Sequence, residues 1–106
     1  MVEGESFVSA DFWHETRLEL HRRFGDEVFI LPQCSAAGDQ SPHPLLYQAA
    51  EAAMRERRGL TEREEIARRI ANAVGETLEV STDGICTDPP FRHLVHTLDL
   101  AARAVT

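Results

Sequence analysis

The residue types that could do chemistry gather in one short stretch of the sequence, Cys34–His43. This stretch follows the apolar run Val28–Leu31 and precedes a helix-forming segment that starts near Pro44. The order predicts a strand, a loop of small residues and the start of a helix. Loops at the carboxyl ends of strands in open α/β sheets carry the binding groups of such folds. We therefore expect this loop to contribute to any site that the protein has.

Ser41 is the strongest candidate in the loop. Pro42 follows it, which pushes the backbone of Ser41 towards the extended region, and Pro42 itself suits the first position of a helix. In one interpretation Ser41 is only the N-cap of that helix. In the other, its Oγ stands at the positive end of the helix dipole, where an alkoxide or a developing oxyanion would be stabilised. The two interpretations are compatible, and the sequence leaves both open.

Cys34 and Asp39 are weaker candidates. A phosphatase-type thiolate needs an arginine to close its phosphate cradle, and none lies between Cys34 and Arg55. A buried, inert thiol is the simpler interpretation of Cys34, and a turn or cap that of Asp39. The hydrolase motif GxSxG and the dinucleotide-binding motif GxGxxG are both absent from the sequence.

The histidines do not predict a metal site. His14 and His21 would share a helix face without an acidic partner, and His93 and His96 would fall on opposite faces of an extended segment. The two cysteines form neither a CxxC pair nor a disulfide framework, and no Cys/His group has zinc-finger spacing. We expect the chain alone to bind no zinc.

Composition excludes several classes of protein. A chain of 106 residues is at most one domain with a modest core. A formal charge of -7, from 18 acidic and 11 basic residues, argues against nucleic acid as a partner, because phosphate binding needs lysine and arginine. No apolar run approaches the roughly 20 residues of a membrane span, and the acidic start Met1–Glu5 does not resemble a signal peptide. We expect a soluble chain, and its localisation stays open.

Hydrophobic and capping patterns predict three helices. These lie between Asp11 and Gly25, between Pro44 and Gly59, and after a capping box formed by Thr61 and Glu64. The inner face of the first should comprise Trp13, Leu20 and Phe24, with Leu18 beside them. The inner face of the third should comprise Ile66, Ile70, Ala73, Val74 and Leu78. Charged residues of the third helix, Glu65, Arg68 and Arg69 among them, are interpreted as a solvated face with i,i+4 pairing.

Three short runs predict strands: Ser6–Ala10, Val28–Leu31 and Leu94–Leu100. For the last segment a strand fits better than a helix, although Leu100–Ala104 taken alone could equally be helical. A strand–helix–strand order of this length is a right-handed crossover between parallel neighbours. The predicted fold class is α/β, with the helices packed on a mainly parallel small sheet.

The run Ala36–Pro42, with Ser9–Phe12 one crossover upstream, resembles the serine-bearing core of the neutral/alkaline, non-lysosomal ceramidase family. Further segments, Arg68–Ala71 and Thr97–Leu100, follow in the order expected for the family. Its Gly-Asp-x-Ser-Pro motif holds the serine implicated in catalysis beside a zinc ion, and the matching residues here are Gly38, Asp39, Ser41 and Pro42. The resemblance implies a zinc-dependent amidohydrolase that cleaves a lipid amide, ceramide, into a sphingoid base and a fatty acid.

The chain also departs from the family. Gln40 and His43 stand where the ceramidases usually carry Val and Asn, which resembles a divergent bacterial branch. Nothing matches the zinc-ligand histidines that precede this region in the family, or the Glu and Tyr ligands that follow it. The resemblance therefore implies that the 106-residue chain is a single partial domain, an internal part of a larger α/β catalytic domain. There Ser41 would be nucleophile or transition-state ligand, Gly38 would allow close backbone approach, and Asp39 would orient the loop.

The alternative comes from a different class of protein. It is a non-catalytic small α/β interaction module, or a truncated, inactive copy, in which Ser41 is only a cap and a partner chain covers the sheet edges. Zinc-binding histidine motifs encoded immediately upstream would favour the enzyme, and clean gene boundaries would favour the module.

Overall fold

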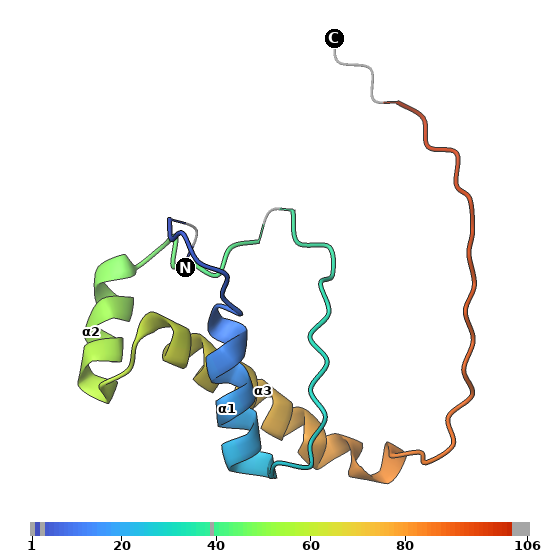
Figure 1. Ribbon diagram of the computed structural model, residues 1–106, viewed down its shortest axis with the longest axis horizontal. Coiled ribbons are helices and arrows are strands. Elements are labelled where there is room, and N and C mark those ends of the chain that lie inside the picture. The colour runs from blue at the N-terminus through green and yellow to red at the C-terminus, as the bar shows by residue number, and fades with distance from the viewer. Residues whose placement is uncertain (1, 3, 39, 103–106) are drawn as a thin grey trace.

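The computed structural model describes residues 2, 4–38 and 40–102, and within these it contains helices and no strand. The elements are α1 (Phe12–Phe24), α2 (Gln48–Arg58), α3 (Glu62–Ser81) and the short 3-10 helix η1 (Thr82–Gly84), as Figure 1 shows. The predicted α/β fold, with helices packed on a mainly parallel small sheet, is therefore wrong.

The runs expected as strands lie in the irregular parts of the chain. The side chains of Phe29 and Leu98 are 83% and 75% exposed, and the segment after η1 runs away from the helices in Figure 1. A strand exists only when a neighbouring strand fills its backbone hydrogen bonds. Alternating apolar residues indicate a segment that could be half buried. The pattern does not show that a neighbouring strand is present to pair with it. The expectation for Ser6–Ala10 fails in the same way.

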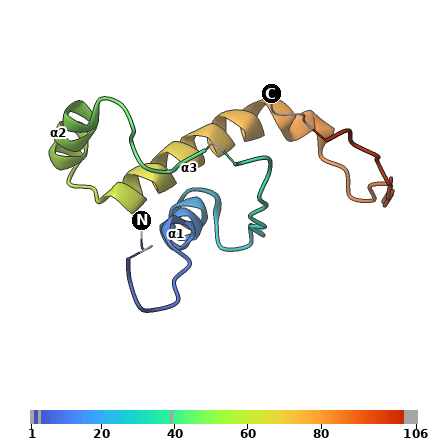
Figure 2. The ribbon, with the colours of Figure 1, turned by 90° about the horizontal axis from the view of Figure 1, so that it is seen from above.

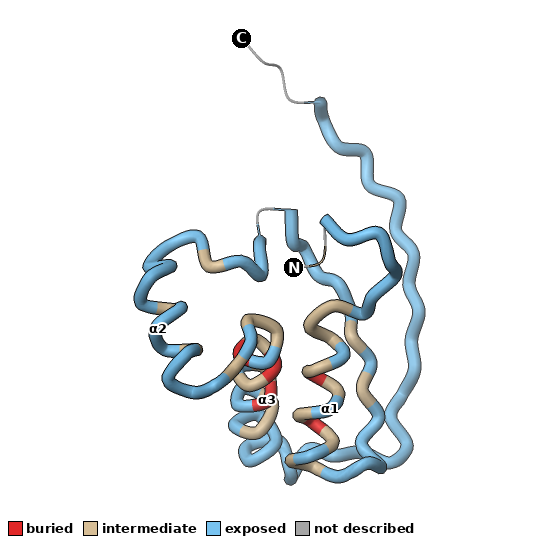
Figure 3. Tube along the Cα trace, turned by 60° about the vertical axis from the view of Figure 1, so that its left-hand side comes forward, coloured by how far each residue is buried: buried red, intermediate tan, exposed pale blue. Residues whose placement is uncertain are grey.

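The core is a seam between α1 and α3. Thr16 and Leu20 on α1 are 0% and 5% exposed, and Ala67 and Ala71 on α3 are 2% and 0% exposed. In Figure 3 the buried positions of the described residues lie on α1 and α3, and these four fall where the two helices pack together. Each pair is spaced by four residues, so it forms one stripe on its helix. The Thr16 hydroxyl donates to the Phe12 carbonyl at 2.8 Å, which satisfies it inside the seam.

The expected end of the first helix is confirmed. Gly25 follows Phe24 with φ 96, and its N–H donates to the His21 carbonyl at 2.9 Å. Glycine tolerates this positive φ because it has no Cβ. Asp11 does occupy the N-cap position, but its side chain makes no capping hydrogen bond, and its N–H donates to Ser9 Oγ at 3.0 Å.

The second helix starts later than expected, at Gln48 rather than near Pro44. Its end is as predicted, since Gly59 adopts φ 64 and donates to the Glu56 carbonyl at 3.0 Å. No residue of α2, which the structure describes in full, is buried. Short helices gain most of their stability from tertiary packing. Leu45 is 72% exposed and packs against little, so its packing stabilises no additional helical turn before Gln48.

The capping box of the third helix is confirmed, and its inner face is not. Glu64 Oε2 accepts the Thr61 N–H at 2.7 Å, and Thr61 Oγ1 accepts the Glu64 N–H at 3.3 Å. The predicted inward residues are instead half-buried or exposed: Ile66, Ile70, Ala73, Val74 and Leu78. The small residues Ala67 and Ala71 face α1 instead. Small side chains allow the backbones of α1 and α3 to approach closely. A Cβ on Gly75 would lie 3.5 Å from the Phe24 ring, which continues this stripe.

The molecule is expanded for its length. Its radius of gyration is 18.6 Å, whereas a compact chain of roughly this size has about 13 Å. Figures 1 and 2 show why, since two long irregular segments leave the helical part, one between α1 and α2 and one after η1. None of the helices in the described part of the chain has the length and hydrophobicity of a membrane span.

Candidate functional site

Ser41 lies in the irregular segment between α1 and α2, and it is exposed. Its Oγ accepts the backbone N–H of His43 at 3.2 Å. The residue at the N-cap of α2 is Tyr47, so the interpretation of Ser41 as the cap is wrong. The expected help from the helix dipole fails for the same reason, since dipole effects fade beyond the first turn. What remains is an exposed hydroxyl with one backbone N–H directed at it.

The residues expected to support Ser41 are only partly placed. Gly38 and Pro42 are exposed, and a Cβ on Gly38 would meet nothing within 4 Å. The chain by itself therefore contains no close approach that requires glycine at this position. The Gln40 N–H donates to the Ala37 carbonyl at 3.1 Å, which folds the loop into a turn. Asp39, the expected orienting residue, lies outside the described residues.

Cys34 is exposed, so the expectation of a buried thiol is wrong. Its Sγ donates to the carbonyl of Ser35 at 3.3 Å. The run Val28–Leu31 before it forms no strand, so no sheet is present among the described residues that could cover the thiol.

Two of the histidines contact different parts of the chain. The ring Nε2 of His21 is 3.2 Å from the Val28 carbonyl, and His43 Nδ1 is 3.9 Å from Glu62 Oε1. In the described part of the chain, no group of three His, Cys, Asp or Glu side chains could hold a metal ion. The described residues by themselves therefore supply no ligand set for the zinc ion that the family resemblance implies.

A recess connects the loop after Ser41 to the helices. It has a volume of about 320 Å³ and is lined by His43, Pro44, Gln48, Ala52, Arg55 and Glu62. The lining comes from the loop, from α2 and from the first residue of α3. The position of this loop therefore depends on how α2 sits beside α3.

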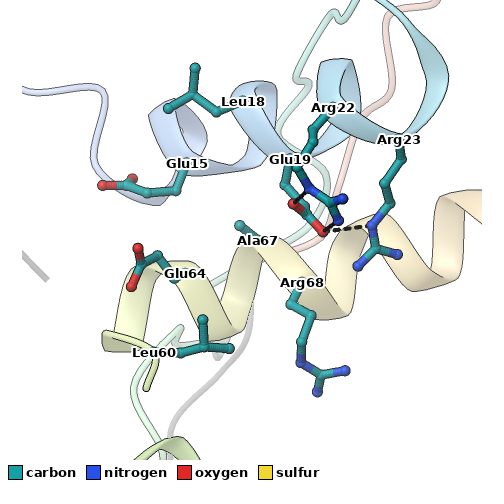
Figure 4. Close-up of a pocket in the computed structure, with 9 residues that line it drawn as sticks. All are labelled: Glu15, Leu18, Glu19, Arg22, Arg23, Leu60, Glu64, Ala67 and Arg68. Atoms are coloured by element: carbon teal, nitrogen blue, oxygen red, sulfur yellow. Dashed lines mark hydrogen bonds and ion pairs between the residues drawn. The ribbon is translucent and has the colours of Figure 1, made fainter. Parts of the chain in front are cut away.

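A larger recess of about 440 Å³ lies between α1 and α3, and Figure 4 shows it in close-up. Its lining comprises Glu15, Leu18, Glu19, Arg22, Arg23, Leu60, Glu64, Ala67 and Arg68. Glu19 accepts hydrogen bonds from Arg22 Nε at 2.7 Å and Arg23 Nε at 2.6 Å. Arg22, and then Arg23, lowers the pKa of Glu19 to about 2. A general base works best with a pKa near the working pH, so Glu19 is an ion-pair residue rather than a base.

Glu65 is the residue that sequence reasoning missed. Its side chain is only 4% exposed, and it accepts from Arg58 at 3.1 Å and from Arg68 and Arg69 at 2.8 Å. Arg68 lowers its pKa to about 2 with help from Arg69 and Arg58, although burial acts in the opposite direction. The expected i,i+4 pairing is confirmed, but the solvated face is wrong at this residue. The sequence shows Arg68 and Arg69 at i+3 and i+4, whereas Arg58 arrives only through the turn at Gly59.

Comparison with known proteins adds no relative. No family model, no curated protein and no solved structure matches this chain, so a function has to be inferred from its own residues.

Proposed function

We propose that this chain is the serine-bearing segment of a ceramidase-like amide hydrolase, which cleaves an N-acyl, ceramide-type amide when it is part of a complete catalytic domain. One observation supports this proposal above others. Ser41, in the run that resembles the family motif, has an exposed hydroxyl that no helix uses as a cap. The simplest competing explanation, that Ser41 serves only as the N-cap of α2, is therefore excluded.

The local geometry suits a nucleophile. Attack of Ser41 Oγ on the amide carbonyl forms an O–C bond and passes the hydroxyl proton to a base of the complete domain. The C–N bond then breaks as the sphingoid amine takes up that proton and leaves, and water cleaves the acyl ester to release the fatty acid and restore the hydroxyl. The His43 N–H, 3.2 Å from Oγ, favours negative charge on that oxygen as the proton leaves. Zinc in this proposal belongs to the complete domain, because the described residues contain no ligand set for it.

Exposed apolar residues support the idea of a partial domain. Phe29, Leu94 and Leu98 are 83%, 74% and 75% exposed and belong to the two irregular segments. Burial of a large apolar side chain stabilises a folded protein by about 1.5–3 kcal/mol. Packing of these side chains against further structure would therefore be favourable. The remainder of a hydrolase domain would supply that structure.

The same exposed segments favour a second candidate, a non-catalytic interaction module or a truncated, inactive copy. In that case a partner chain would cover the apolar side chains and Ser41 would have no chemical role. The two candidates differ in one property, which is whether Ser41 is needed for hydrolysis.

The test uses the full-length product of the gene that encodes this chain. Ser41→Ala should lower hydrolysis of an N-acyl sphingoid substrate by orders of magnitude, because a nucleophile has no substitute. Ser35→Ala, which removes another exposed hydroxyl from the same segment, is the matched control and should retain activity. Undiminished hydrolysis by a folded Ser41→Asn variant would remove Ser41 from the mechanism and favour the module.

A further inference from the structure

α2 is held to the rest of the molecule in an unusual way. None of its residues is buried, although the structure describes the whole helix. Figures 1 and 2 show it standing off the N-terminal end of α3, while α1 lies along the middle of α3. The short turn from Gly59 to Thr61 is the covalent connection. Apolar packing therefore does not determine the orientation of α2.

Ion pairs bridge α2 and α3 instead. Arg58, the last residue of α2, donates to Glu65 Oε1 at 3.1 Å. Arg69 on α3 donates to the same Glu65 oxygen at 2.8 Å and also to Glu51 on α2. Glu65 is therefore the point at which both bridges meet. Because the Glu65 side chain is only 4% exposed, water screens its own two contacts less than it screens a pair of exposed side chains.

The loop that carries Ser41 continues directly into α2. The recess beside it is lined by His43, by Gln48 and Arg55 of α2, and by Glu62 of α3. A change in the orientation of α2 therefore moves one wall of this recess and the end of the loop.

We propose that Glu65 is a positioning residue that anchors α2 against α3 and, through α2, places the loop of Ser41. The part that concerns Ser41 rests on the proposed hydrolase function, and the anchoring itself does not. Glu65→Gln keeps the shape of the side chain and removes its charge. The guanidinium groups of Arg58, Arg68 and Arg69 then lose their shared carboxylate and repel one another. The bridge through Arg58 is lost and, of the two bridges, only the Arg69–Glu51 bridge remains, so α2 is held less firmly against α3.

Double electron–electron resonance on the chain tests the anchor. Spin labels go on Ala53→Cys in α2 and Glu76→Cys in α3, both exposed positions, in a background of Cys34→Ser and Cys86→Ser. The parent should give one narrow distance distribution. Glu65→Gln should broaden it and shift it to longer distances, while circular dichroism retains the helical signal.

Two matched variants separate anchoring from a general loss of stability. Glu19→Gln removes another arginine-paired carboxylate, but both its partners lie on α1, so the distribution should stay narrow. Leu20→Ala weakens the seam between α1 and α3 and should also leave it narrow. If Glu65→Gln does not fold, Glu51→Gln removes the outer bridge alone and should broaden the distribution to a smaller extent.

The outcomes distinguish the two proposals. An unchanged distribution in Glu65→Gln, or equal broadening in Leu20→Ala, would overturn the anchor and leave the hydrolase proposal standing. Unchanged hydrolysis in full-length Ser41→Ala would overturn the hydrolase proposal. The anchor proposal would still stand, because the spin-label distances do not depend on Ser41. If both proposals hold, full-length Glu65→Gln should lose kcat with its fold retained, and Glu65→Asp, which keeps the charge, should restore part of it.

Discussion

Glu65 shows how a single buried carboxylate can be tolerated in a small helical molecule. Burial of a charge is costly unless partners compensate for it, and here three guanidinium groups do so. Two of these groups remain partly in water, with side chains of Arg58 and Arg69 that are 41% and 49% exposed. The carboxylate is thus desolvated while its partners keep much of their hydration, which lowers the overall cost.

The lowered pKa of Glu65 predicts loss of stability in acid. Its pKa falls from 4.5 to about 2 on folding, so the folded state binds fewer protons in this range. The stabilisation is complete above pH 4.5 and is lost as the pH falls from there towards 2. The urea midpoint should therefore decrease over that window, and Glu65→Gln should reduce the decrease. Glu76→Gln, at an exposed position of the same helix, is the control. Parallel pH profiles for the parent and Glu65→Gln would contradict the ion-pair geometry.

At the scale of elements, α1 and α3 meet through small residues rather than through the branched apolar residues of α3. Ala67 and Ala71 are the positions that α1 covers, and Gly75 extends the stripe under the Phe24 ring. Close packing of small residues leaves no room for added methylene groups.

Substitution to leucine tests which face of α3 is inward. Ala71→Leu should destabilise the chain by about 1–3 kcal/mol, because it overpacks a position that is 0% exposed. Ala73→Leu makes the same chemical change at an exposed position and should alter the free energy of unfolding by less than about 0.5 kcal/mol. Urea denaturation at unchanged slope measures both. A larger effect at Ala73 would restore the inner face predicted from hydrophobic periodicity.

The whole molecule combines a small helical core with long irregular segments. The residues after η1, 85–102, are exposed throughout. Proteases bind extended, accessible backbone, so segments of this kind are cut before helices. The shape of the molecule therefore makes a direct prediction about cleavage.

Limited trypsin digestion should cleave after Arg92 before it cleaves after Arg68 or Arg69. Arg92 lies in the exposed irregular segment, whereas the other two lie in α3 beside the buried Glu65. Mass spectrometry of early time points gives the order, and the urea-unfolded chain, in which all three sites are open, is the control. Early protection of Arg92 would show that other structure covers this segment, as the strand prediction for Leu94–Leu100 requires.

The sequence by itself determined the features that depend on a few neighbouring residues. Gly25 and Gly59 end helices because each adopts a positive φ, and the Thr61–Glu64 box opens α3 because its partners are three residues apart. The role of Ser41 rests on its motif alone and stays a prediction. Only the tertiary structure decided the rest. Strands need partners that no local pattern supplies, and the inner face of a helix depends on which helix packs against it. The burial of Glu65 required the turn at Gly59 to bring Arg58 back to α3, a contact that joins two helices and leaves no periodic signal.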